Sequence, residues 1–336
     1  MKLFRKNVLS ERAERAMQKT LANVYAQRRS RFRILACIDE TEESFDTVRM
    51  AAKLARTDEC DIIVLFVRPI DQGLWSGGLQ VRVARQNILD AGLELPGINK
   101  LKRTLEVLEE EGIPAKDWGR KTGHQDAWGD PLGDNKVEFV SEQGRSVVLK
   151  LKTAPEPAAG ILDQYELGPY NLIIMGEPSR WRGEFRSLFD AGIVQQVTIH
   201  APCSVMVVRQ PLDKEGFFIC TDGSSRSMQA VRRAAVLAHT AGQPITLFSA
   251  SAHESGLAAA EENVKNARAL LKAMGIKVKE IKTAVGPVAR MIVETGSAYG
   301  VIVVTDEGRT RIQRVIKGST AVDVVRTAKS SVLDVR

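Results

Sequence analysis

An internal repeat constrains the fold of this 336-residue chain more than any other feature. In each half a short apolar run ends in an aspartate, with a cysteine two residues before it, at residues 32–39 and 215–222. An alanine-rich segment of helical period follows each run, and a second apolar run follows each of these segments. Because a repeated sequence is the signature of a repeated structural unit, we expect the two halves to share one fold.

The later parts of the two halves also match. An apolar run at residues 171–176 corresponds to one at 300–305, and each half closes with a helical segment followed by a last apolar run. These closing pairs are residues 193–200 with 205–208, and residues 320–328 with 332–335. Short β-branched runs separated by helical segments are typical of βαβ units. We therefore predict an α/β fold with two tandem, doubly wound, mainly parallel sheets of five strands, and four helices in each half.

The repeat also sets the expected domain boundaries. We expect a basic helical arm at residues 1–30, a first domain with insertions at 31–210 and a second domain at 214–336, both of ordinary domain size. The first domain holds surplus residues, which we place near 70–95 and 114–146. The second insert contains Trp118, His124 and several aspartates among glycines, a spacing that does not diagnose a metal site. We expect a loop or a small hairpin that covers one face of the sheet.

Positive charge is concentrated in the arm. The chain has a formal net charge of +7, but residues 1–33 hold ten Lys or Arg against two glutamates, so the remainder is close to neutral. Apolar residues at helical spacing predict an amphipathic helix that packs on the body or on a partner chain. An acidic membrane surface is the alternative target of the arm. The charge of the body disfavours nucleic acid as a partner.

Cysteine usage and hydropathy bound the compartment. The four cysteines are isolated and show neither disulfide nor metal-site spacing. No apolar run has the length of a membrane span, and the beginning of the sequence lacks a secretory signal. We expect a cytoplasmic protein in which each cysteine is a small buried apolar residue.

These motifs together resemble those of tandem universal stress proteins, over about residues 31–336. In the second half the resemblance is carried by Thr221, Asp222 and the residues after them, and by Thr305 and Gly308 followed, after nine intervening residues, by Gly318 and Ser319. In the first half it is carried by Ile38, Asp39 and the closing phrase at residues 200–208. The resemblance implies open twisted sheets of strand order 3-2-1-4-5, with a ligand crevice at the carboxyl ends of strands 1 and 4.

The resemblance also implies a nucleotide site in the second half. By position, Asp222, Ser249 and Ala250 lie beside adenosine, while Gly308, Gly318, Ser319 and Thr320 hold phosphate. Glycine lets backbone N–H groups approach phosphate closely, and the start of a helix supplies unpaired donors. We expect ATP as the ligand, with AMP or ADP as alternatives and Mg²⁺ as an optional companion ion.

The second half departs from the family's ATP motif at one residue. Thr305 stands where the motif begins with glycine, and a β-branched residue disfavours a positive φ. We expect its hydroxyl to donate a hydrogen bond to the ligand instead. Basic residues lie between the two glycines and either neutralise phosphate or form a solvated face; they are Arg309, Arg311, Arg314 and Lys317.

The first half departs further. Ala191 and Gly192 replace the Gly–Ser pair, and Glu177 and Pro178 occupy the turn that follows the fourth strand. Pro178 removes a backbone donor from that turn. Acidic residues follow Asp39 at positions 40, 42 and 43, an acidic mouth that should repel a polyphosphate unless a metal intervenes. We predict a degenerate nucleotide site in this half.

The sequence offers no nucleophile–base set and no P-loop, so we name no catalytic residue and expect at most slow ATP hydrolysis. We expect a stress-response regulatory protein whose association with protein partners depends on adenine nucleotide bound in the second domain. The alternative is a scaffold or adaptor whose tandem domains form a pseudo-dimer and whose arm docks on a partner or a membrane.

Family domains pair through their last strands, as the resemblance implies. Residues 205–208 and 332–335 are therefore expected to pair inside this chain, or to mediate self-association between chains. Asp334 interrupts the second of these strands, and if it is buried it needs a partner or water.

Overall fold

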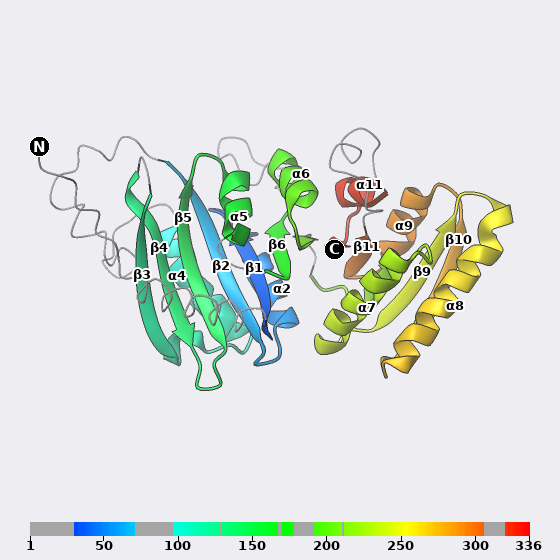
Figure 1. Ribbon diagram of the computed structural model, residues 1–336, viewed down its shortest axis with the longest axis horizontal. Helices are drawn as coiled ribbons and strands as arrows, with labels where there is room; N and C mark the ends of the chain where they lie inside the picture. The colour runs from blue at the N-terminus through cyan, green and yellow to red at the C-terminus, as the bar shows by residue number, and fades with distance from the viewer. Residues whose placement is uncertain are drawn as a thin grey trace, which may run out of the picture.

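The computed structural model describes residues 30–70, 97–127, 130–166, 170–177, 191–209, 212–305 and 320–336. Within these ranges one twelve-stranded sheet runs through both halves, in the order β10-β9-β8-β11-β12-β7-β6-β1-β2-β5-β4-β3. In Figure 1 the β3–β4 hairpin lies at one end of the molecule and β10 lies toward the other, with the C-terminus between the halves. The predicted arm and the insert near residues 70–95 lie outside the described residues, apart from Ser30 and Ile70.

The second half has the predicted number of strands. They are β8 (Phe217–Cys220), β9 (Ile245–Ser251), β10 (Glu280–Val285), β11 (Val301–Thr305) and β12 (Ser331–Val335). All neighbouring pairs among them are parallel, and their spatial order is 3-2-1-4-5. The accompanying helices are α7 (Ser225–Thr240), α8 (Leu257–Ala273), α9 (Val288–Gly296) and α11 (Thr320–Thr327). The predicted doubly wound fold is confirmed for this half.

Within its described residues the first half has seven strands, two more than the five that we predicted. They are β1 (Phe32–Ile38), β2 (Cys60–Pro69), β3 (Gly119–Ala127), β4 (Asp130–Val140), β5 (Ser146–Ala154), β6 (Leu172–Gly176) and β7 (Ser204–Val208). Strands β5-β2-β1-β6-β7 repeat the parallel 3-2-1-4-5 order. The helices are α2 (Phe45–Leu54), α4 (Ile98–Glu110), α5 (Pro157–Glu166) and α6 (Ala191–His200).

The two additional strands come from the second insert. Strands β3 and β4 form an antiparallel hairpin, and β4 pairs antiparallel with β5 from Asn135–Leu151 to Val140–Ser146. The hairpin therefore extends the edge of the sheet. We had expected it to cover a face of the sheet, and that expectation was wrong. The physical reason is that β5 would otherwise present a row of unpaired N–H and C=O groups, which a further strand satisfies.

Helices cover both faces of the continuous sheet. Alternate residues of a strand point to opposite faces, so Ile34 belongs to one apolar core and the adjacent Leu35 to the other. The first core contains side chains of α2, α4, α7 and α8, and the second contains side chains of α5, α6, α9 and α11. In the described part of the chain, no helix combines the length and the apolar character that crossing a membrane requires.

The two halves join through their last strands, as predicted. Strands β7 and β12 pair antiparallel, with Val332 opposite Val207, Leu333 opposite Met206 and Asp334 opposite Val205. Each of these strands also pairs with a neighbour in its own half, so both of its edges are occupied. The other expectation, self-association of separate chains through these strands, is therefore wrong for this arrangement. Asp334 is buried, and Nη2 of Arg336 lies 3.4 Å from its Oδ2 atom, which supplies the required partner.

Two arginines at equivalent positions reinforce this seam. Arg209, directly after β7, donates to the main-chain oxygen of Val325 in the last turn of α11 and to that of Ser330 just after this helix. Arg336, directly after β12, donates to the main-chain oxygens of Thr198 and Ala201 at the end of α6. Each guanidinium thus reaches from one half to carbonyl groups near a helix C-terminus of the other, where positive charge is favourable. We call these contacts the arginine clamps.

Candidate ligand-binding site

The turn after β8 is fixed by short-range hydrogen bonds. The Ser224 N–H donates to Oδ1 of Asp222 at 2.9 Å, and Oγ of Ser224 accepts from the Ser227 N–H at 3.2 Å. Ser224 therefore caps α7. Gly223 has φ +78°, and a Cβ atom there would collide with the side-chain oxygen of Asn263 on α8. Glycine is required at this position both for its backbone conformation and for the close approach of α8.

The carboxyl ends of β8, β9 and β11 and the start of α11 enclose a cavity of about 100 Å³. Five residues predicted for the nucleotide site line it, namely Asp222, Ser249, Ala250, Thr305 and Thr320. The other three, Gly308, Gly318 and Ser319, lie outside the described residues, as do the basic residues between the glycines. The fold thus brings Asp222 next to Thr305 across the point where the strand order reverses. The role of these residues in binding stays a prediction.

The cavity has an apolar lining and a polar rim. Phe248, Val304 and Ile292 are almost completely buried and form part of the lining, together with Cys220 and Val288. Burial raises the pKa of the Cys220 thiol, so this cysteine is an apolar contact and not a reactive group. Ser249 is buried and accepts a hydrogen bond from Nδ2 of Asn263 at 3.3 Å. Such a lining suits a flat, largely apolar ligand with polar groups at its edge.

The hydroxyl of Thr305 has a partner within the protein. Its Oγ1 hydroxyl donates to the main-chain oxygen of Val335 at 3.0 Å, so its proton is committed to the neighbouring strand β12. Thr305 still lines the cavity, but what its hydroxyl offers a ligand is an acceptor. This bond forms because the carbonyl at the end of β12 lies within reach of the end of β11. The expectation that Thr305 donates to a ligand stays a prediction, and it requires this bond to be exchanged.

Asp222 is the exposed charged group of this site. Burial by itself would raise the pKa of its carboxyl, but hydrogen bonds from Ser227, from Ser224 and from the main chain outweigh that effect. The pKa consequently lies below its ordinary value. The carboxylate is ionised at neutral pH and available to accept hydrogen bonds at the mouth of the cavity.

Asn263 and Ser227 belong to the site and were not identified from the sequence. Asn263 on α8 donates to Ser249, and Oγ of Ser227 lies 2.9 Å from Oγ1 of Thr221. A usable signal existed for Ser227, because it follows the capping Ser224 by three residues on a helix that begins there. No local pattern marks Asn263.

The first half repeats the turn but not its surroundings. Oδ1 of Asp39 accepts from the Thr41 N–H at 2.8 Å, the counterpart of the Asp222 bond to Ser224. Asp39, however, is only 2% exposed, whereas Asp222 is exposed. The backbone geometry of the repeat is retained, while the first aspartate is closed off from solvent.

The predicted acidic mouth of the first half is partly neutralised. Glu42 pairs with Lys100 at 2.5 Å and with Arg103 at 3.3 Å, both on α4, and the hydrogen bond from Lys100 lowers the pKa of Glu42. Glu177 pairs with Arg209 at 3.1 Å. Within the described residues Glu40 and Glu43 make no ion pair. Because Glu42 and Glu177 are paired, the excess negative charge of the mouth is smaller than the sequence suggested.

Across the described ranges, no group of three or more His, Cys, Asp or Glu is placed to hold a metal ion. Nδ1 of His124 instead lies 3.0 Å from Oδ1 of Asn135, across the β3–β4 hairpin.

Comparison with known proteins decides the family. The model of the universal stress protein family matches the chain twice, at residues 31–209 and 217–336. The chain belongs to the universal stress protein family. Its two matches fall on the two halves of the repeat, so it is a tandem member. A search of curated proteins found no match.

Solved structures agree with this assignment. A protein from Pseudomonas aeruginosa UCBPP-PA14, provisionally named a universal stress protein, aligns with a TM-score of 0.59 and 15% identity over 92% of this chain and 94% of its own. A universal stress protein from Archaeoglobus fulgidus DSM 4304 aligns with a TM-score of 0.54 and 15% identity over 90% of this chain and 96% of its own. A universal stress protein solved in complex with cAMP is 26% identical over 37% of this chain and 97% of its own, with a TM-score of 0.33. At these identities the first two likenesses show the fold alone.

Proposed function

We propose that this tandem universal stress protein binds an adenine nucleotide, ATP above all, in the cavity beside Asp222. Occupancy of the site then controls how the protein associates with its partners. The observation that supports this best is the convergence of Asp222, Ser249, Ala250, Thr305 and Thr320 on one cavity at the carboxyl ends of three parallel strands. Ligands in open α/β sheets bind at that edge.

The adenosine end of the ligand has suitable contacts. The apolar lining from Phe248, Val288 and Ile292 matches the faces of an adenine ring, and the ionised Asp222 accepts hydrogen bonds from ribose hydroxyls. The cavity of about 100 Å³ is smaller than the roughly 300–1,000 Å³ of a complete small-molecule site. The described residues therefore enclose one end of the nucleotide only.

The phosphate end is assigned mainly from the sequence. Thr320 begins α11 and lines the cavity, and a helix start offers free N–H groups and a positive dipole end to an anion. The preceding Gly318 and Ser319, with Gly308, are the residues we propose for the phosphates. Slow hydrolysis is the most activity we expect, and a cytoplasmic location stays a prediction.

A scaffold function is the second candidate, and the arginine clamps favour it. They make the two halves one unit in which the equivalent strands already form a pseudo-dimer inside the chain. A protein of this kind presents a fixed surface to partners without any ligand.

Calorimetric titration of the full chain with ATP, ADP, AMP and cAMP tests the first proposal against the second. We expect ATP to bind once per chain, and Ala250→Trp to weaken binding more than a hundredfold because the indole fills the cavity. Ala269→Trp is the matched control, since Ala269 is exposed on α8 and does not line the cavity. Absence of heat with every nucleotide, or equal affinity in the two tryptophan variants, would favour the scaffold.

Gly318→Asp separates the two ends of the ligand. We expect it to weaken ATP more than AMP, because the new carboxylate repels the outer phosphates. An equal loss for both nucleotides would remove Gly318 from the phosphate site while leaving the adenosine site in place. Analytical ultracentrifugation with and without ATP then measures whether occupancy changes association.

A further inference from the structure

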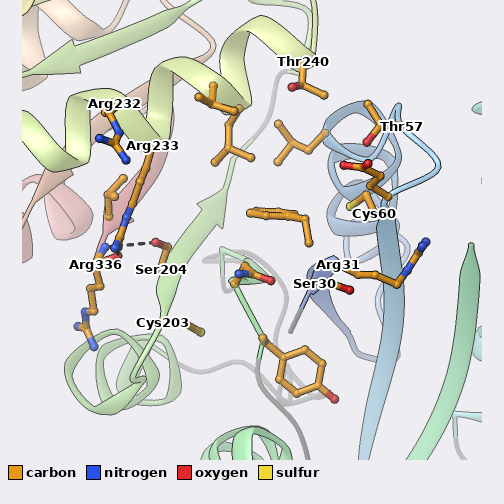
Figure 2. A pocket seen from close by; sticks show the side chains of 18 of the residues that line it. Ser30, Arg31, Thr57, Cys60, Cys203, Ser204, Arg232, Arg233, Thr240 and Arg336 are labelled. Atoms are coloured by element: carbon orange, nitrogen blue, oxygen red, sulfur yellow. Dashed lines mark hydrogen bonds between the residues drawn. The ribbon is translucent and has the colours of Figure 1, made fainter. Parts of the chain in front are cut away.

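A second and larger cavity lies between the two halves and shares no lining residue with the nucleotide cavity. Its volume is about 750 Å³, within the range of small-molecule sites. Its floor comes from the amino ends of first-half strands, including Phe32, Cys60 and Ser204. Because β7 and β12 pair antiparallel, these amino ends lie at the same edge of the sheet as the carboxyl end of β12. One wall is α7 and the other is the loop after α2 (Figure 2). We call this cavity the inter-half groove.

Four arginines and one glutamate are the charged residues that line the groove, so the surplus charge is positive. Three of the arginines are already engaged. Arg31 pairs with Asp61 at 2.8 Å, Arg336 pairs with Asp334 and with α6, and Arg233 donates to the main-chain oxygen of Arg336. Arg232 is exposed and, within the residues that the structure describes, makes no hydrogen bond or ion pair. Figure 2 shows Arg232 extending from α7 on the same side as Arg233 and Arg336.

An apolar side chain lies one helical turn from this free guanidinium. Val236 is 47% exposed and is the large apolar residue left exposed in the described part of the chain. Residues four apart share one face of a helix, so Arg232 and Val236 face the groove together. Leu54, Leu237 and Tyr170 continue the apolar lining. The groove thus combines one guanidinium that is unpaired among the described residues with an apolar wall, and the exposure of this wall to water is unfavourable in free energy.

We propose that the inter-half groove binds an amphipathic organic anion with a single negative head group, a medium-chain carboxylate being the simplest example. The head group pairs with Arg232 and the apolar body lies along Val236 toward the loop after α2. A polyphosphate fits less well, because only one guanidinium is free to neutralise it. The ligand touches both halves and therefore stabilises their mutual arrangement.

Charge also decides between this ligand and the basic arm that precedes Ser30. Ser30, the last residue of the predicted arm, lines the groove together with Arg31. The first 33 residues nevertheless carry ten Lys or Arg against two glutamates, and the groove is itself positive. Like charges disfavour the arm as the occupant.

Calorimetric titration of the full chain with decanoate and with decyltrimethylammonium tests the proposal, because the two probes share a ten-carbon chain and differ in head-group charge. We expect one decanoate per chain and no binding of the cation. Loss of a hydrogen bond to a charged group corresponds to about a tenfold to hundredfold loss of affinity, so we expect Arg232→Gln to weaken decanoate by at least about tenfold. Val236→Asp should weaken it similarly.

Two control variants complete the test. Arg268→Gln removes an exposed arginine from α8, outside the groove, and should leave the affinity for decanoate unchanged. Ala250→Trp blocks the nucleotide cavity and should also leave the affinity for decanoate unchanged. Failure of the groove proposal is therefore distinguishable from failure of the nucleotide proposal. Equal binding of the two probes, or unchanged affinity in Arg232→Gln, would overturn the proposal. A shift of Arg232→Gln between monomer and dimer with unchanged affinity for decanoate would overturn it too, and would identify the groove as an interface between copies.

Discussion

The two halves are alike where they touch each other and unlike where a ligand would enter. At the seam, Arg209 and Arg336 occupy equivalent positions and make equivalent contacts with the opposite half. At the crevice, Asp39 and Asp222 make the same turn, but one is buried and the other is exposed. Each half needs the seam in order to cover an open strand edge, whereas one functional crevice is sufficient. The comparison indicates that pairing constrains both copies, whereas the proposed ligand binding would constrain one.

The largest expected effect is on the seam. Arg336→Ala leaves the buried Asp334 without its cation, and removing one partner of a buried ion pair costs about 3–5 kcal/mol of the free energy of unfolding. Arg209→Ala should cost less, about 1–3 kcal/mol, because its acidic partner Glu177 is 35% exposed and can be solvated. Urea unfolding followed by circular dichroism measures both. A larger cost for Arg209→Ala would contradict this account of the clamps.

The next effect separates the two aspartates. Asp39→Ala should lower the free energy of unfolding by about 1–3 kcal/mol, because the Thr41 N–H loses its hydrogen-bond acceptor in a turn that is closed off from solvent. Asp222→Ala should cost less stability, because solvent replaces the carboxylate, yet it should weaken ATP binding about tenfold. Urea unfolding and calorimetric titration with ATP should be measured on both variants. A loss of nucleotide affinity in Asp39→Ala and not in Asp222→Ala would contradict the proposed difference between the two aspartates.

A smaller effect concerns the glycine in the exposed turn. Gly223→Ala and Gly275→Ala both place a side chain at positive φ, which costs about 1–2 kcal/mol. Gly275 has open space around its missing Cβ, whereas Gly223 faces Asn263. We therefore expect Gly223→Ala to be the more destabilising of the two in thermal unfolding. Equal melting temperatures would show that Asn263 moves aside freely.

The smallest effect is a pH dependence. Because the folded-state pKa of Asp222 is lowered, its contribution to stability is present above the ordinary carboxyl pKa and is lost as pH falls through the folded-state value. The difference in melting temperature between the unmodified protein and Asp222→Asn should therefore narrow on going from pH 7 toward acid. A difference that widens toward acid would reverse the assigned sign.

The fold was largely predictable because the repeat indicates two α/β units, while the resemblance to universal stress proteins implies their strand order and the pairing of their last strands. The sequence showed that the β3–β4 hairpin is an insert but did not predict where it lies. Its polar and glycine-rich sequence does not indicate which strand edge it will join. The arginine clamps were missed although an arginine follows the last strand of each half, because the accepting carbonyls lie more than a hundred residues away. The convergence of Asp222 and Thr305 followed from topology, whereas the Thr305 bond to Val335 depends on the register of β12.

Strand β12 has a consequence for how the chain folds during synthesis. It fills the space between β11 and β7, and Arg336 reaches Ser204 across a separation of 132 residues. Until the ribosome has released this segment, β7 carries an open row of amide and carbonyl groups, and such long-range pairing forms late. The nascent first half is thus the species that a chaperone would protect, and closure by β12 ends that vulnerability.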